Sequence, residues 1–144
     1  MILQISSRFT IAVHILTCID YFSDDYTITS EFLASSIGVN PVIVRQILIR
    51  LKAAGLIEVS RGKGDIKLRK PLENISMYDV YKAAEIVKGK LFRFHSNPNP
   101  ECPVGKNIHF ALDESLDDIQ NALEEKMKTI YLQEIAEKIK IPPK

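Results

Sequence analysis

The sequence predicts a mainly α-helical protein that carries one small β-hairpin. Apolar residues recur at helical spacing over most of the 144-residue chain, and residues that favour helix ends bound these segments. Two short segments, residues 56–60 and 65–69, alternate apolar and polar residues as half-buried strands do. With 46% hydrophobic residues, the chain is long enough for one domain with a substantial core.

Two helices are predicted near the start of the chain. Residues 6–22 carry apolar side chains nearly all round, so this helix is expected to be buried, with Ser6 or Ser7 as its N-cap. After a turn, Thr29 can cap a short second helix over residues 30–37.

A glycine turn separates the second helix from a third. Gly38 supplies the left-handed residue that ends the second helix. Asn40 is the expected N-cap of the third helix and Pro41 its first residue, because the fixed φ of proline suits that position. The third helix should run to about Ala54 and end at Gly55.

The two alternating segments are expected to pair as a hairpin. The sequence RGKG, residues 61–64, joins them, and its glycines can adopt the positive φ values of a tight tip. Ser76 then caps a further helix, with Asp79 three residues on in its first turn.

A loop and a long helix are predicted for the last third of the chain. Prolines and asparagines mark residues 96–105 as a loop, and a short last helix over about residues 130–140 ends before Pro142. Between them, apolar residues repeat with a spacing close to a heptad, which is typical of a helix that packs along a second helix. We expect this seam to form a dimer interface: Ile108, Leu112, Leu116, Ile119, Leu123 and Met127.

Positive charge is concentrated in one segment of a nearly neutral chain. The formal net charge is +1, yet residues 41–70 hold eight cations against two anions. Residues 1–40 hold one cation against four anions, and residues 71–144 hold ten against twelve. A concentrated basic segment is typical of a protein with an anionic partner such as nucleic acid.

Two helices joined by a three-residue turn and followed by a β-hairpin form a winged helix-turn-helix. The N-terminal end of the second helix reaches base edges in the major groove, where arginine and glutamine can make bidentate contacts. Cations on the hairpin tip, the wing, can enter the minor groove of double-stranded DNA or hold its phosphates. The candidate DNA-binding residues are Asn40, Val42, Ile43, Arg45, Gln46, Arg50, Arg61 and Lys63.

These residues are similar to those of a known family. The chain resembles the Rrf-two family of bacterial transcription regulators, also called BadM-type winged-helix proteins. The resemblance rests on ISSRFTIAVHIL at the start, SEFLASSIGVNPVIVRQILIRLKAAGLIEVSRGKG in the middle, ISMYDVYKAAE after the hairpin, and CPVG before the long helix. We expect a winged helix-turn-helix head over residues 1–72. A continuous unit of linker helix, loop and dimerisation helices should follow over residues 73–144.

The resemblance also implies how the protein binds DNA. The long helix would cross its partner in a homodimer, and the two heads would bind a pseudo-palindromic operator, with repression as the expected outcome. Val42, Ile43, Arg45 and Gln46 match the base-facing part of the family's recognition helix, and Arg61 matches its wing arginine. The wing RGKGD is shorter and more charged than the family's longer run of glycines.

The cysteines argue against an iron–sulfur cluster. The best-known relatives bind one through three cysteines in the loop before the long helix, and this chain has only Cys102 there. Cys18 falls in the apolar first helix, where a buried core residue is expected. His95 and His109 can supplement Cys102, but cluster ligation normally needs four cysteines or a similar set. We therefore expect no metal and no cofactor.

The sequence leaves the regulatory signal open. Cys102, close to Lys106 and to a helix N-terminus, can have a lowered pKa and act as a redox-sensing thiol, or it can be structural. The segment KGKLFRFHSNPNPEC, residues 88–102, can line a pocket for a small-molecule effector, or its aromatic side chains can simply pack.

The expected function is a DNA-binding transcription regulator. The alternative is a protein–protein interaction module that dimerises without binding DNA. The sequence has no nucleophile–base pattern and no phosphate-binding loop that would indicate an enzyme. It has no apolar run of about 18 residues and no signal-peptide cleavage site, so we expect a cytoplasmic protein without a membrane partner.

Overall fold

The computed structural model describes residues 6–62, 64–84, 91–92 and 94–140. The helices and strands follow the order expected from the sequence. They are α1 (Ser7–Phe22), α2 (Ser30–Ile37), α3 (Pro41–Ala53), β1 (Ile57–Val59), β2 (Ile66–Leu68), the 3-10 helix η1 (Leu72–Asn74), α4 (Met77–Ala84), α5 (Pro103–Met127) and α6 (Leu132–Lys140).

The helix ends form through the caps that the sequence predicts. The Ser6 hydroxyl accepts from the backbone N–H of Arg8 at 3.3 Å, and the Thr29 hydroxyl accepts from Phe32 at 3.1 Å. At the start of α4, Ser76 and Asp79 form a reciprocal capping box with hydrogen bonds of 3.0 and 3.1 Å.

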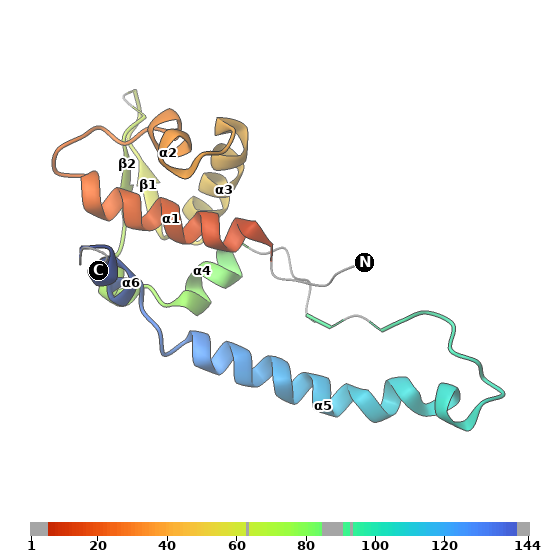
Figure 1. Ribbon diagram of the computed structural model, residues 1–144. Helices are drawn as coiled ribbons and strands as arrows, with labels where there is room; N and C mark the ends of the chain where they lie inside the picture. Colours follow the sequence, from red (N-terminus) through yellow and green to blue (C-terminus); the bar gives the residue numbers. More distant parts are fainter. Residues whose placement is uncertain (1–5, 63, 85–90, 93, 141–144) are drawn as a thin grey trace.

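The head is built around α1. The elements α2, α3 and the hairpin lie on one side of it, and α4 and α6 lie on the other (Figure 1). A single cluster of buried apolar side chains joins these layers. Its fully buried members include Ile15, Leu16, Ile19, Leu33, Val44, Ile47, Leu51 and Leu132.

The hairpin has the register expected of two short antiparallel strands. Ile57 pairs with Leu68 and Val59 pairs with Ile66. At the tip, Gly62 and Gly64 have φ values of 87° and 64°, which side chains rarely adopt. The glycine tip predicted from the sequence is therefore confirmed for these two residues.

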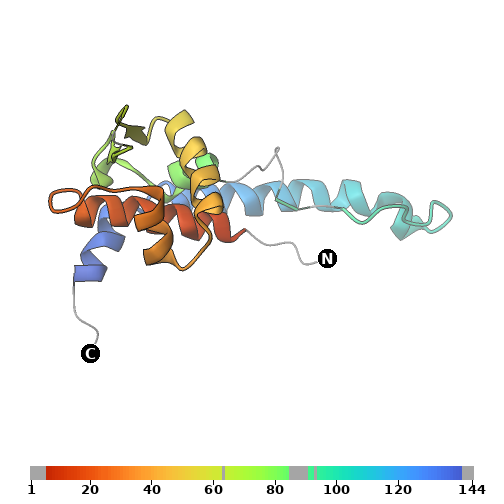
Figure 2. The same ribbon diagram turned by 90° about the horizontal axis from the view of Figure 1, so that it is seen from above.

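The segment before α5 leads away from the head, and the long helix α5 returns toward it (Figures 1 and 2). No residue of α5 is buried within the chain. Phe94 stacks on His109 with ring centroids 4.5 Å apart, and the space between this segment and α5 is only about 10 Å³. The described part of the segment therefore packs on α5; residues 88–90 and 93 lie outside the described residues.

The last helix returns to the head. Leu132 and Ala136 of α6 are buried against the core, and the backbone N–H of Leu132 donates to the Ile75 carbonyl at 2.9 Å. The core thus includes residues on both sides of the predicted boundary between residues 72 and 73, and that division stays a prediction.

No single helix in the part of the chain that the structure describes is long and apolar enough to cross a membrane. The pair α2 and α3 passes the same test of length and composition together, with a bend of 114° between the two helices.

Candidate nucleic-acid interface

The elements α2 and α3 form a helix-turn-helix. The two helices meet at 114°, within the range of about 90–120° that this motif adopts. Gly38 ends α2 with φ 80°, and its N–H donates to the Ala34 carbonyl at 2.8 Å. Asn40 caps α3 through a 2.9 Å hydrogen bond from the backbone N–H of Val42. The cap places Asn40 in a structural role at the end of the helix that would face DNA.

The helix α3 has one buried face and one exposed face. Val44, Ile47, Leu48 and Leu51 are buried and recur at helical spacing. The side opposite presents apolar groups to solvent: Val42 is 52% exposed, Ile43 38% and Ile49 69%. Gln46 is also exposed. Exposed apolar residues beside polar ones suit a surface that meets both thymine methyl groups and base edges.

Arg45 is held from α2. Its Nη2 donates to a Glu31 carboxylate oxygen at 2.8 Å, and its Nε donates to the Ser30 hydroxyl at 3.4 Å. Hydrogen bonds from the backbone N–H of Glu31 itself and from Arg45 hold the pKa of this carboxyl below its ordinary value. Glu31 is therefore charged at neutral pH. The guanidinium stays half exposed, with 52% of the side chain open to solvent.

Arg50, unlike Arg45, contacts the backbone of another helix of the head, α4. Its Nη1 donates to the backbone carbonyl of Ala84 at 3.0 Å, and the residue is half-buried. This contact ties the C-terminal part of α3 to the end of α4. We therefore assign Arg50 a structural role, and its contact with DNA stays a prediction.

The wing is anchored to the segment between α1 and α2. The Asp65 carboxylate accepts from the backbone N–H of Ile28 at 3.0 Å, and the Ile28 carbonyl accepts from Ile66 at 3.0 Å. Arg61, at the tip, is exposed. Lys63, the other predicted wing cation, lies outside the described residues. A hollow of about 440 Å³, lined by Arg45, Ile49 and Val59 among others, separates the wing from α3.

Cys102 lies at the start of α5 and is half-buried. It is the N-cap residue of the helix, and the backbone N–H groups of Gly105 and Val104 lower the pKa of its thiol. A lowered pKa agrees with the redox-sensing alternative, one of the two that the sequence leaves open for this residue. Gly105 is required here because a Cβ on it would lie 2.6 Å from the Asn99 carbonyl oxygen.

A helix-turn-helix followed by an anchored wing defines the class of winged-helix transcription regulators. The profile of the Rrf2 family, described as an iron-dependent transcriptional regulator, matches residues 5–138. The chain belongs to the Rrf2 family, which confirms the resemblance stated above.

Individual relatives agree with this assignment. The Bacillus subtilis protein YwnA, named as an HTH-type transcriptional regulator, is 39% identical over 132 residues, which are 92% of this chain and 96% of YwnA. A crystal structure described as a DNA-binding protein superimposes with a TM-score of 0.72 at 35% identity, covering 90% of this chain and 98% of the other. Staphylococcus aureus CymR, in an oxidized form, has the same fold with a TM-score of 0.66 at 20% identity, covering 98% and 99%.

Within the part of the chain that the structure describes, no ligand set of an iron site comes together. In residues 6–62, 64–84, 91–92 and 94–140, no three His, Cys, Asp or Glu side chains gather where they could hold a metal ion. Cys18 is buried in α1, where its thiol is hydrogen-bonded to the Ser36 hydroxyl at 3.2 Å, and Cys102 is the N-cap of α5. A single loop cysteine falls short of the roughly four ligands that a cluster needs. None of the functions proposed below depends on iron.

Three residues that shape the interface were missed in the sequence. Glu31 and Ser30 hold Arg45 from 14 and 15 residues away, and Asp65 holds the wing to a backbone group 37 residues away. The only signal in the sequence was the polarity of these side chains, which does not indicate a partner; of the three, Asp65 alone lies within the basic segment, residues 41–70.

Proposed function

We propose that the protein is a sequence-specific transcription regulator, with repression as its expected action, that binds double-stranded DNA as a homodimer at a pseudo-palindromic operator. The observation that carries the proposal is the outer face of α3. It combines exposed apolar groups with an arginine whose guanidinium is fixed in place yet half exposed. A solvated surface helix does not need either feature.

Arg45 is the principal candidate for reading a base. A guanidinium has five N–H donors, and Glu31 and Ser30 take two of them. The remaining donors can make a bidentate contact with guanine. Because the guanidinium is held before DNA arrives, less side-chain freedom is lost on binding. Gln46 can make a second base contact, and Val42 and Ile43 can meet thymine methyl groups.

The wing supplies contacts that do not depend on base sequence. Arg61 is exposed at the tip, and the anchor at Asp65 fixes the hairpin relative to the helices of the head. An arginine in this position can enter the minor groove or hold the flanking phosphates. In the proposed complex, the two α3 helices of a dimer enter major grooves about one helical turn apart, roughly 34–36 Å.

The homodimer is proposed to form along α5. This helix has 25 residues, none of them buried within the chain, although six apolar residues form its seam and Ile119 is 54% exposed. Each of these side chains, if fully buried by a partner, would contribute about 1.5–3 kcal/mol as an upper estimate. A second copy of the helix is the partner that the heptad-like spacing favours.

Light scattering tests the dimer. The double variant Leu116→Glu, Leu123→Glu should be monomeric or unfolded, because it places charges on the seam. Asn121→Glu adds the same charge to the exposed opposite side of α5 and should stay dimeric. A dimeric double variant would exclude this helix as the interface.

A salt-dependent mobility shift on genomic fragments tests DNA binding. DNA binding should weaken steeply as the salt concentration rises, because lysine and arginine side chains that contact phosphates release counterions from the DNA. The fragments that the protein retains identify the operator. If no fragment is retained at low salt while the dimer persists, the protein is an interaction module and the proposed DNA binding is wrong.

A second proposal concerns Cys102. The backbone N–H groups at the start of α5 lower the pKa of its thiol, which favours the reactive thiolate. Cys102→Ser should leave DNA binding in reductant unchanged and remove any response to oxidant. Identical responses to oxidant in variant and wild type would assign Cys102 a structural role only.

A further inference from the structure

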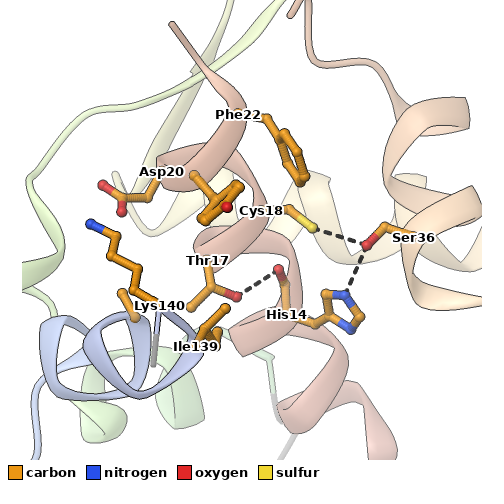
Figure 3. Close-up of a pocket in the computed structure, with 10 residues that line it drawn as sticks. His14, Thr17, Cys18, Asp20, Phe22, Ser36, Ile139 and Lys140 are labelled. Carbon is orange, nitrogen blue, oxygen red and sulfur yellow. Dashed lines mark hydrogen bonds between the residues drawn. The ribbon is translucent and has the colours of Figure 1, made fainter. Parts of the chain in front are cut away.

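A cavity of about 180 Å³ lies between three helices of the head, away from α3 and the wing. Figure 3 shows its walls: α1 supplies the floor, the end of α2 one side, and the last turn of α6 the other. A volume near 180 Å³ is below the roughly 300–1,000 Å³ of pockets for drug-sized ligands. The cavity therefore suits a metabolite of amino-acid size.

The interior of the cavity is mostly apolar, and the polar side chains of Thr17 and Ser36 already have partners. Ser36 Oγ is hydrogen-bonded to His14 Nε2 at 3.1 Å and to the Cys18 thiol at 3.2 Å. The Thr17 hydroxyl donates to the Val13 and His14 carbonyls within α1. Because these groups are satisfied, the remaining surface offered to a ligand is that of Phe22, Ile139 and neighbouring apolar atoms.

The rim carries one charge of each sign. In Figure 3 the Asp20 carboxylate and the Lys140 ammonium group lie near each other at one edge of the residues that line the cavity. Within the part of the chain that the structure describes, no ion pair or hydrogen bond holds either side chain. Two unpaired charges of opposite sign next to an apolar interior are complementary to a zwitterion with an apolar side chain.

We propose that this cavity binds a small free α-amino acid with an apolar side chain. The α-ammonium group pairs with Asp20, the α-carboxylate pairs with Lys140, and the side chain enters the space beside Phe22 and Ile139. Neither a simple carboxylate nor a simple amine uses both charges of the rim.

The cavity lies where a bound ligand can influence DNA binding. This link to DNA binding rests on the function proposed above. The walls of the cavity join α2, which leads through Gly38 into α3, and α6, which follows the long helix α5. A ligand that bridges these helices stabilises one position of α2 and α3 relative to α5.

Isothermal calorimetry on the full DNA-free chain tests the binding site. The probes are L-leucine, 4-methylpentanoate, which lacks the ammonium group, and 3-methylbutylamine, which lacks the carboxylate. L-Leucine should bind, and each analogue should bind about tenfold more weakly or worse, because each loses a charged hydrogen bond. No heat with L-leucine, L-methionine or L-phenylalanine would overturn the proposal, as would equal affinity for leucine and its two analogues.

Two pairs of variants assign the charges. Asp20→Asn should weaken L-leucine and leave 4-methylpentanoate unchanged, and Lys140→Met should weaken L-leucine and leave 3-methylbutylamine unchanged. Asp24→Asn and Lys138→Met remove exposed charges that do not line the cavity and should bind L-leucine like wild type. Wild-type affinity in Asp20→Asn and Lys140→Met would overturn the proposal. DNA titration without amino acid tests the proposed function separately, because it does not need the cavity to be filled.

Discussion

The hydrogen bond between Asp65 and the backbone N–H of Ile28 should stabilise the wing, and Asp65→Ala tests it. The variant leaves this N–H without its acceptor, in a residue that is 0% exposed. An unsatisfied buried donor costs about 1–3 kcal/mol. The second contact of Asp65, to Lys67 at 3.9 Å, is half exposed on the lysine side and should add little.

The assay is thermal unfolding followed by circular dichroism. For a chain of this size, each kcal/mol lost from the free energy of unfolding lowers the melting temperature by about 4 °C. Asp65→Ala should therefore lower the melting temperature by about 4–12 °C. Asp65→Asn keeps an oxygen acceptor and should retain most of the stability. An unchanged melting temperature in Asp65→Ala would refute the reasoning.

The same change should weaken DNA binding through the wing. If the anchor serves to place Arg61, Asp65→Ala should reduce affinity in the wild-type background and have little further effect in an Arg61→Ala background. Fully additive losses in the double variant would mean that Asp65 acts on DNA binding by some route other than Arg61.

Further outcomes follow from the site. Glu31→Gln should leave the melting temperature nearly unchanged, because the ion pair of Glu31 with Arg45 is exposed. The variant should lower the ratio of matched to mismatched DNA affinity, since a released Arg45 also reaches phosphates. An unchanged ratio would show that Glu31 does not orient Arg45. Iodoacetamide should alkylate Cys102 at lower pH than free cysteine, because a thiol with a lowered pKa forms thiolate at lower pH. The buried Cys18 should react slowly. A pH profile of alkylation like that of free cysteine would contradict the lowered pKa of Cys102. Protein purified without oxygen should be colourless and free of iron and sulfide, and a stoichiometric cluster in the absorbance spectrum would overturn this.

Local features of the fold could be predicted from the sequence. Helix caps depend on residues within one turn of each other, so neighbouring positions of the sequence are enough to predict them. This holds for the caps at Ser6, Thr29 and Asn40 and for the left-handed Gly38. The inward face of α3 follows from helical spacing alone. The seam of α5 is also a periodic signal, and a second copy of the helix is its proposed partner.

The parts that sequence reasoning missed depend on tertiary contacts. Nothing adjacent to Arg50 indicates that its guanidinium meets the Ala84 carbonyl, 34 residues away. The same holds for Glu31 beside Arg45 and for Asp65 beside Ile28. The cavity was equally hidden, because it forms only when α6 returns to α1. For residues 88–102 the sequence leaves open whether they line a pocket or simply pack, and their described part packs on α5.

The central claim is that the exposed end of α3 reads base sequence, and one titration tests it most directly. Wild type and Arg45→Ala are titrated by fluorescence anisotropy against the selected operator and a set of its single-base variants. The account predicts that Arg45→Ala loses discrimination at one base position in each half-site, by about 1–3 kcal/mol, and keeps it elsewhere. An equal loss of affinity on every sequence would mean that Arg45 holds the phosphate backbone, and the assignment of α3 as the base-reading helix through this residue would be wrong.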